Sequence, residues 1–245
     1  MNRHISYRSG NPVLNKNSFN STSLSSETMT IEGTVNKTVM CLILLVGSGY
    51  YTFTSVSSIM LILFGVGGLI TAIITIYKKE WAPITVPIYA VLEGGLLGGI
   101  SYIYSSTYDG IVTNAIFITI GILLSLLMAY KSGLIKPTEN FKLGVAAATG
   151  GIMIVYFVNM IMSFFGSSMG VMDPTNASIM SIGFSLLIIV IASLNLVLDF
   201  DFIEEAAEKK APKYMEWYGA FGLLVTLIWL YLEILRLLSK LNSRR

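Results

Sequence analysis

Seven apolar stretches follow one another along the chain with short polar connections between them. Each stretch is close to the roughly 20 residues that a helix needs to cross a bilayer. The pattern therefore predicts an all-α membrane protein, a seven-transmembrane-helix bundle in which neighbours in sequence are antiparallel neighbours in space. The predicted helices are 35–53, 58–77, 83–104, 110–130, 141–165, 178–200 and 218–238.

Polar positions in the predicted helix 178–200 recur at helical spacing. At about 100° per residue, Asp199 shares one face with small and polar residues, whereas Asp201 points to another side of the helix. We interpret Asp199 as facing the bundle interior and Asp201 as lying at the membrane interface. The alternative is that Asp199 only ends the helix among the headgroups. The face shared with Asp199 contains Ser181, Ser185, Ala192 and Asn195.

The predicted helix 218–238 carries a matching stripe, which should also face inward because every polar residue of this helix falls on one side. Glu233 and Arg236 are three residues apart and could pair along the helix. They would then either line a path or only hold the packing. The stripe consists of Gly219, Gly222, Thr226, Trp229, Glu233, Arg236 and Lys240.

A further carboxylate, Glu93, sits near the middle of the predicted helix 83–104, in the run LEGGLLGG at 92–99. Its glycines form two overlapping small-xxx-small pairs, which predict a close approach by another helix. A carboxylate at this depth must be protonated, paired or in a wet cavity, or else bonded in its neutral form to a neighbouring backbone. In helix 141–165, Asn159 and Tyr156 are weaker candidates for the interior.

Composition strengthens the membrane assignment. The chain is 54% hydrophobic and only 12% charged, whereas a soluble domain has about 25% charged residues. A net charge of +2 without a dense basic patch gives no reason to expect a nucleic-acid partner. The single cysteine, Cys41, and the single histidine, His4, exclude an intrachain disulfide, a thiolate metal cluster and a zinc site ligated by several histidines. We therefore expect no enzyme, no catalytic residue and no bound cofactor.

Outside the apolar region 35–238, we expect two short tails. Residues 1–34 are polar and have no apolar core, so we predict a disordered cytoplasmic segment and not a cleaved signal peptide. Residues 239–245 form a short basic C-terminal tail.

Lysine and arginine are concentrated in alternate connections between the helices, and this distribution predicts the orientation in the membrane. Three alternate connections, 54–57, 105–109 and 166–177, hold no lysine or arginine, so the N-terminus should be cytoplasmic. The C-terminus breaks the pattern, because seven spans put it outside although it carries Arg236, Lys240, Arg244 and Arg245. Either the last helix crosses despite that bias, which we favour, or it enters and returns. The cations at the predicted cytoplasmic side are Arg3, Arg8, Lys16, Lys37, Lys78, Lys79, Lys131, Lys136, Lys142, Lys209, Lys210 and Lys213.

Two segments give the chain a resemblance to the transmembrane Bax-inhibitor-motif family: LDFDFI at 198–203 and YLEILRLL at 231–238. The runs RSGNP at 8–12 and LEG at 92–94 are similar to a bacterial branch of that family. The resemblance implies that the C-terminal helix is central. It also implies that one carboxylate from each of the last two helices forms a pH-sensitive latch on a calcium leak. By position the pair is Asp199 and Glu233, with glutamate in place of the family's aspartate.

The physical chemistry of such a latch is straightforward. Two carboxylates held together in a medium of low dielectric cannot both ionise cheaply, so they share a proton, and its loss drives the two helices apart. A hard cation such as Ca²⁺ prefers oxygen ligands and could replace that proton, so Asp199 and Glu233 are also a candidate calcium site. Glu93, Arg236, Asn195 and Asn159 are further candidates for a pore or for pairing.

The resemblance, together with these residues, predicts that the protein is a pH-sensitive, calcium-permeable leak channel of the bacterial inner membrane. We expect a monomer whose partners are the lipid bilayer and calcium ions, and no nucleic acid. The alternative is a non-conducting regulator that binds membrane proteases or stress-response proteins through residues 1–27 and the charged loop 201–216. An intramembrane enzyme is disfavoured, because the Gly-x-Gly-Asp motif of membrane aspartyl proteases is missing.

Overall fold

The computed structural model describes residues 28–54 and 57–244, and in this part of the chain seven helices are long and apolar enough to span a membrane. The predicted all-α, seven-helix architecture is therefore confirmed. The short 3₁₀ turns η1 (Lys79–Trp81) and η2 (Gly170–Met172) lie in two of the connections. The seven helices are α2 (Ile31–Phe53), α3 (Ser58–Tyr77), α4 (Ala82–Thr107), α5 (Ile111–Lys131), α6 (Glu139–Phe164), α7 (Ile179–Glu208) and α8 (Met215–Asn242).

Most predicted helix ends agree with the structure to within four residues, and α3 agrees at both ends. The exception is α7, which continues eight residues beyond the predicted end at position 200. Residues 1–27 of the predicted tail lie outside the described residues, together with Arg3, Arg8, Lys16 and Arg245.

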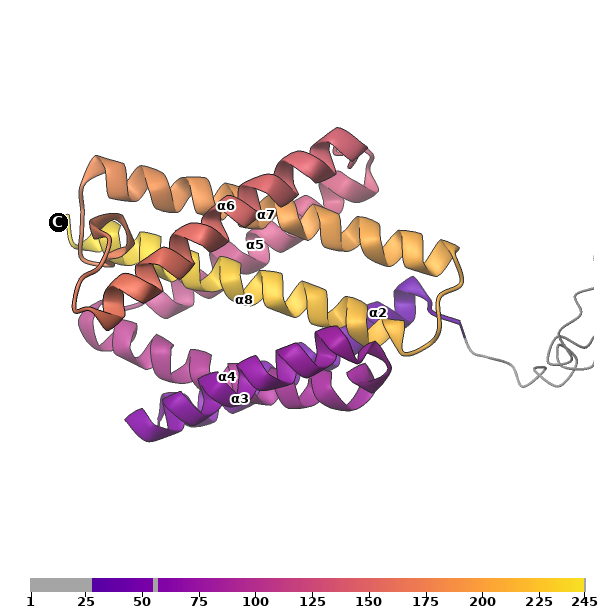
Figure 1. Cartoon of the computed structure of the whole chain (residues 1–245), viewed down its shortest axis with the longest axis horizontal. Coiled ribbons are helices and arrows are strands. Elements are labelled where there is room, and N and C mark those ends of the chain that lie inside the picture. Colours follow the sequence, from indigo (N-terminus) through magenta and orange to yellow (C-terminus); the bar gives the residue numbers. More distant parts are fainter. Residues whose placement is uncertain (1–27, 55–56, 245) are drawn as a thin grey trace, which may run out of the picture.

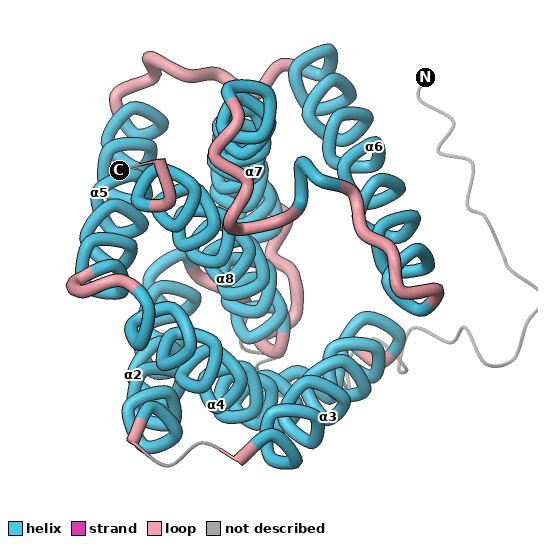
Figure 2. Tube along the Cα trace, turned by 90° about the vertical axis from the view of Figure 1, so that its left-hand side faces the viewer, coloured by secondary structure: helices cyan, strands magenta, loops and turns pink. Residues whose placement is uncertain are grey.

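Helix α8 is the centre of the bundle. It packs against α2, α4, α5 and α7, and Figure 2 shows it surrounded by the other helices. In Figure 1 it runs through the middle of the molecule, with α6 and α7 on one side and α3 and α4 on the other. Its 28 residues form one unbroken helix, about 42 Å long at 1.5 Å per residue. It is therefore long enough to cross a membrane.

The glycines of α4 allow α2 and α3 to approach very closely. A Cβ atom on Gly98 would lie 2.1 Å from the carbonyl oxygen of Gly49 in α2, and one on Gly99 would lie 2.1 Å from the Leu61 side chain in α3. Successive glycines thus face two different helices, so one small-residue run serves two close contacts. These contacts join α2, α3 and α4 into one half of the bundle.

The beginning of α2 is anchored to the connection between α7 and α8. The backbone N–H of Met29 donates to the carbonyl oxygen of Ala211 at 2.7 Å. The Glu216 side chain is fully buried and accepts hydrogen bonds from the N–H and the hydroxyl of Thr30, both at 3.0 Å. Lys37 and Lys213 form ion pairs with the same carboxylate. This anchor fixes the first span to the N-terminal end of the central helix.

Contacts also gather the cation-bearing connections at one end of the bundle. Lys142 at the start of α6 pairs with Asp201 near the end of α7 at 2.7 Å. The ammonium of Lys79 lies 5.0 Å from the ring centre of Tyr218 near the start of α8. The described connections that carry lysines therefore lie at one end of the bundle, as the sequence predicts.

Candidate functional site

The polar stripe of α8 faces the interior of the bundle, as its periodicity predicts. Thr226, Glu233 and Lys240 follow at intervals of seven residues and are almost completely buried. From Thr226 to Lys240 the stripe covers about 21 Å of the helix axis. We call this stripe, together with the side chains of α6 and α7 that bond to it, the polar column.

Asp199 opens the polar column near the middle of the bundle. Its carboxylate oxygen Oδ2 accepts a hydrogen bond from the hydroxyl of Thr226 at 2.6 Å. Within the described residues this is the one hydrogen bond of the Asp199 side chain, and no cation pairs with it. Gly222 allows the approach, because a Cβ atom there would lie 3.4 Å from Oδ1 of Asp199. Asp199 is therefore held against α8 by a neutral partner.

Asp201 contacts a different helix, although it is only two residues from Asp199. It pairs with Lys142 of α6. The helix continues for two further turns to Glu208, so Asp199 does not end α7. The structure thus places Asp199 between α7 and α8 and directs Asp201 toward α6.

Glu233 is the most buried carboxylate of the column, with 1% of the residue exposed. Its oxygen Oε2 accepts from the guanidinium of Arg236 at 2.6 Å and from the hydroxyl of Tyr156 in α6 at 2.8 Å. The indole N–H of Trp229 donates to the same tyrosine oxygen at 3.3 Å. The other oxygen of Glu233, Oε1, is buried without a hydrogen-bond partner in the described part of the chain. Because most buried polar atoms are bonded, this oxygen is an exception that the described side chains do not satisfy.

Arg236 and Lys240 fill the column beyond Glu233. Arg236 stacks over the Tyr156 ring, with its guanidinium carbon 5.7 Å from the ring centre. Lys240 is fully buried and donates from Nζ to the carbonyl oxygens of Val171 and Ser181, at 2.7 and 3.2 Å, and to the hydroxyl of Ser185 at 2.9 Å. Three acceptors match the three N–H groups of an ammonium. Arg236 and Lys240 thus bond to groups inside the bundle. This explains why these two cations of the C-terminal region do not follow the alternation of charge seen in the loops.

The two asparagines make different contacts. Asn195 of α7 donates to the hydroxyl of Thr149 in α6 at 2.7 Å, one helical turn before Asp199. Asn159 of α6 accepts from the backbone N–H of Met169 at 2.8 Å and holds the connection before η2. Next to η2, the carboxylate of Asp173 accepts from the N–H and the hydroxyl of Thr175, and these bonds hold the pKa of Asp173 below its usual value. Asn159 thus holds a connection, whereas Asn195 links α7 to α6 beside the column.

The structure does not bring Asp199 and Glu233 together. Asp199 lies level with Thr226, and Glu233 is seven residues further along α8, about 10 Å along the axis. The reason is the short connection: α7 ends at Glu208 and α8 begins at Met215. Asp199 therefore faces a point only a few turns into α8. The shared proton implied by the resemblance has no geometric basis in this arrangement, and the two carboxylates lie in series along the column.

Glu93 lies apart from the column. Its carboxylate faces α3, where a Cβ atom on Gly68 would lie 2.5 Å from its oxygen Oε1. In the described part of the chain it makes neither a hydrogen bond nor an ion pair with the column residues. Its predicted close helix contact is present, whereas a role in the column is not supported by its position.

Sequence reasoning gave a weak signal for one feature of this region and missed another. The weak signal was for Tyr156, which was a candidate for the interior and whose hydroxyl joins α6 to Glu233, Arg236 and Trp229. The missed feature is the oxygen cage around Lys240, since two of its three ligands are backbone carbonyls, which have no sequence signature. The described residues contain no group of three or more His, Cys, Asp or Glu side chains that could hold a metal ion. The calcium site predicted at Asp199 and Glu233 thus remains a prediction.

Comparison with known proteins gives one finding. A family model described as Bax inhibitor 1 like matches residues 11–243, nearly the whole chain. No curated protein matches the chain.

Proposed function

The chain belongs to the Bax inhibitor 1 like family, and we propose that it is a pH-sensitive, calcium-permeable leak channel of the bacterial inner membrane. In this proposal the polar column is the ion path, and Asp199 and Glu233 are its two cation-binding carboxylates. The N-terminus is cytoplasmic, and α8 crosses the membrane. The observation that carries the proposal is the buried oxygen Oε1 of Glu233 inside the column, which has no hydrogen-bond partner among residues 28–54 and 57–244.

A column of ionisable groups inside a membrane bundle has to be explained by function or by pairing. Pairing accounts for Oε2 of Glu233, which bonds to Arg236 and Tyr156. It does not account for Oε1 of Glu233 or for the single neutral partner of Asp199. Oxygen ligands suit Ca²⁺, and separate weak sites suit permeation, since an ion must be able to leave each site again. Two carboxylates in series support such a path better than one shared site.

In this proposal the arrangement described above is the closed state. Arg236 and Lys240 place two positive charges in the column on the side of Glu233 that is further from Asp199. A divalent cation passing between them would meet like charges in a medium of low dielectric. Opening therefore requires that the C-terminal part of α8 moves relative to η2 and α7, whose oxygens hold Lys240.

The pH response is assigned to Asp199. A carboxylate without a cationic partner in a membrane interior is costly to ionise, so its charge responds to the surrounding pH. Asp201, two residues further along α7, is paired with Lys142 of α6. Raising the pH ionises Asp199 and creates a negative site for Ca²⁺ between α7 and α8. The leak should accordingly increase as the pH rises.

The test is calcium flux into liposomes that contain only the purified protein, measured over a series of pH values. A single carboxyl changes its ionised fraction by at most about tenfold per pH unit, which limits the slope of the response. Asp199→Asn should remove most of that slope. Asp201→Asn is the matched control, because it makes the same chemical change on the side of α7 that pairs with Lys142, and it should keep the slope.

Two outcomes would count against the proposal in different ways. If the slope survives Asp199→Asn but disappears in Asp201→Asn, the pH response belongs to Asp201 and the proposal has chosen the wrong aspartate. Wild-type protein that conducts no calcium at any pH would remove the channel altogether. That second result would favour the alternative, a non-conducting regulator that binds membrane proteases or stress-response proteins.

A further inference from the structure

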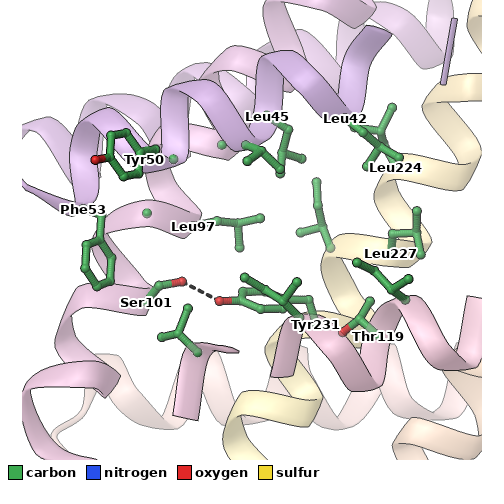
Figure 3. A pocket seen from close by; sticks show the side chains of 18 of the residues that line it. Leu42, Leu45, Tyr50, Phe53, Leu97, Ser101, Thr119, Leu224, Leu227 and Tyr231 are labelled. Atoms are coloured by element: carbon green, nitrogen blue, oxygen red, sulfur yellow. Dashed lines mark hydrogen bonds between the residues drawn. The ribbon is translucent and has the colours of Figure 1, made fainter. Parts of the chain in front are cut away.

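A cavity of about 500 Å³ lies between α2, α4, α5 and α8, on the side of α8 away from the polar column. Figure 3 shows side chains that line it, among them Leu97 and Leu227. Its floor is formed by buried residues of α4 and α8. Its rim is formed by residues of α2 and α5 that are also exposed on the surface of the bundle: Val46, Tyr50, Ile116 and Ile120.

The cavity offers almost nothing to a polar ligand. The hydroxyls of Ser101 and Tyr231 bond to each other at 2.6 Å, as the dashed line in Figure 3 shows. Thr119 donates to the carbonyl oxygen of Ala115 in its own helix. A buried water needs two to four polar partners, and apolar cavities stay dry and take apolar ligands. The lining therefore selects a hydrocarbon.

The opening of the cavity faces the bilayer. Helices α2 and α5 both pack against α4 and α8 but not closely against each other, and Figure 2 shows them on the same side of α8. The exposed rim residues make the cavity continuous with the apolar outer surface of the bundle. In a membrane that surface is covered by lipid chains, so the solvent at the opening is hydrocarbon.

The length of the cavity fits one leaflet. On α2 its lining extends from Leu42 to Phe53, twelve residues whose Cα atoms span about 16 Å along the axis. That is close to half of the roughly 30 Å hydrocarbon thickness of a bilayer. On α4 the lining begins at the middle of the helix and continues toward its C-terminal end, and on α5 it lies mostly in the first half, so both lie toward the cation-free connections. The cavity thus occupies the leaflet at that end of the bundle.

We propose that this cavity binds one acyl chain of a phospholipid from that leaflet, which enters between α2 and α5. The acyl chain fills a space that would otherwise leave the buried side chains of α4 and α8 without contacts on one side. Tyr50, near the end of α2, would then lie toward the ester and headgroup region, a position that favours tyrosine. This site does not depend on the proposed leak, because it lies on the opposite face of α8.

A photoactivatable lipid tests the site directly. The protein is placed in liposomes of phosphatidylethanolamine and phosphatidylglycerol that contain phosphatidylglycerol with a diazirine midway along one acyl chain. After illumination, labelled residues are located by mass spectrometry. Leu227 and Ile228 are 7% and 8% exposed, so lipid on the outer surface hardly reaches them. We expect label on these two residues.

Substitutions at the rim separate a specific site from surface lipid. Val46→Trp and Ile120→Trp place a bulky ring in the opening and should lower the labelling of Leu227 and Ile228 roughly tenfold, because the chain loses its contact surface. The matched controls, Ile43→Trp on α2 and Leu124→Trp on α5, are exposed positions outside the lining and should leave it unchanged. All four positions are exposed, so the fold should tolerate them, which thermal unfolding checks.

The proposal is overturned if label appears only on the exposed faces of α3 and α5, as expected for lipid that merely surrounds the bundle. It is also overturned if Val46→Trp and Ile120→Trp leave the labelling of Leu227 and Ile228 unchanged.

Discussion

Substituting Gly98 by alanine tests the close packing of α2 and α4 with the smallest possible change. The added Cβ atom would lie 2.1 Å from the carbonyl oxygen of Gly49 and equally close to the hydroxyl of Thr52. The threonine side chain can rotate away, but the backbone oxygen is fixed by the helix. The clash can therefore be relieved only if α2 and α4 move apart.

The size of the effect follows from the geometry. Carbon and oxygen approach to about 3.3 Å at the closest. The helices must therefore separate by roughly 1.2 Å at this point, the difference between that limit and the 2.1 Å contact. Overpacking of this kind costs about 1–3 kcal/mol, which corresponds to a fall in Tm of roughly 2–12 °C for a chain of this size.

Two glycines of α2 serve as matched controls for the same substitution. A Cβ atom on Gly47 meets nothing within 4 Å, so Gly47→Ala should stabilise the helix by up to about 1 kcal/mol through its propensity alone. A Cβ atom on Gly49 lies 3.1 Å from the carbonyl oxygen of Gly94. Gly49→Ala should fall between the other two variants.

The measurement is thermal unfolding of the three variants and the wild type in one detergent, at equal protein concentration. The expected order of stability is Gly47→Ala, wild type, Gly49→Ala and Gly98→Ala. If Gly98→Ala melts together with Gly47→Ala, the close contact between α2 and α4 does not constrain the fold and the argument fails.

Three further predictions follow from other parts of the structure. Glu216→Gln should lower the unfolding free energy by about 2–3 kcal/mol, because Lys37 loses a buried charged partner. Glu32→Gln, at an exposed position of the same region, should leave the stability unchanged, and equal melting temperatures of the two variants would count against the anchor. Reporter fusions after positions 16 and 244 should report opposite sides of the membrane, and equal signals would mean that α8 does not cross. Because the pKa of Asp173 is lowered by Thr175, its stabilisation of the α6–α7 connection should be present above the usual aspartate pKa and lost as the pH falls through the lowered value. The loss of stability in Asp173→Asn should thus disappear in acid, and hydrogen exchange of the Thr175 amide measures it.

Much of the architecture could be predicted from local pattern. The length of an apolar stretch reports whether a helix can cross a bilayer, and the spacing of polar residues reports which side of it faces inward. The seven spans, the inward stripe of α8 and the pairing of Glu233 with Arg236 are all properties of this kind, because they depend on residues within one helix. The glycine run of α4 likewise predicted a close contact, although not that it serves two helices.

The relation between helices could not be predicted in the same way. Which residue of α8 lies level with Asp199 depends on where α7 ends and on how many residues the connection uses, and the predicted end of this helix at position 200 is eight residues too early. Helix ends and connections carry weak sequence signals, whereas the level of facing residues is sensitive to each 1.5 Å step along a helix. The burial of Glu216 and Lys240 depends on such relations, since their partners are mostly distant in sequence and several are backbone groups.

The sequence by itself thus determined that this is a seven-span membrane protein, which helix faces are polar and where charge is placed within the spans. These properties are local, because hydrocarbon selects for apolar length and helical spacing within each segment. Only the tertiary structure decided that Asp199 and Glu233 stand in series, that Lys240 fills an oxygen cage and that α2 and α5 leave an apolar cavity beside α8. Each of these depends on how far one helix is shifted along another, and that shift is set by the packing of the whole bundle.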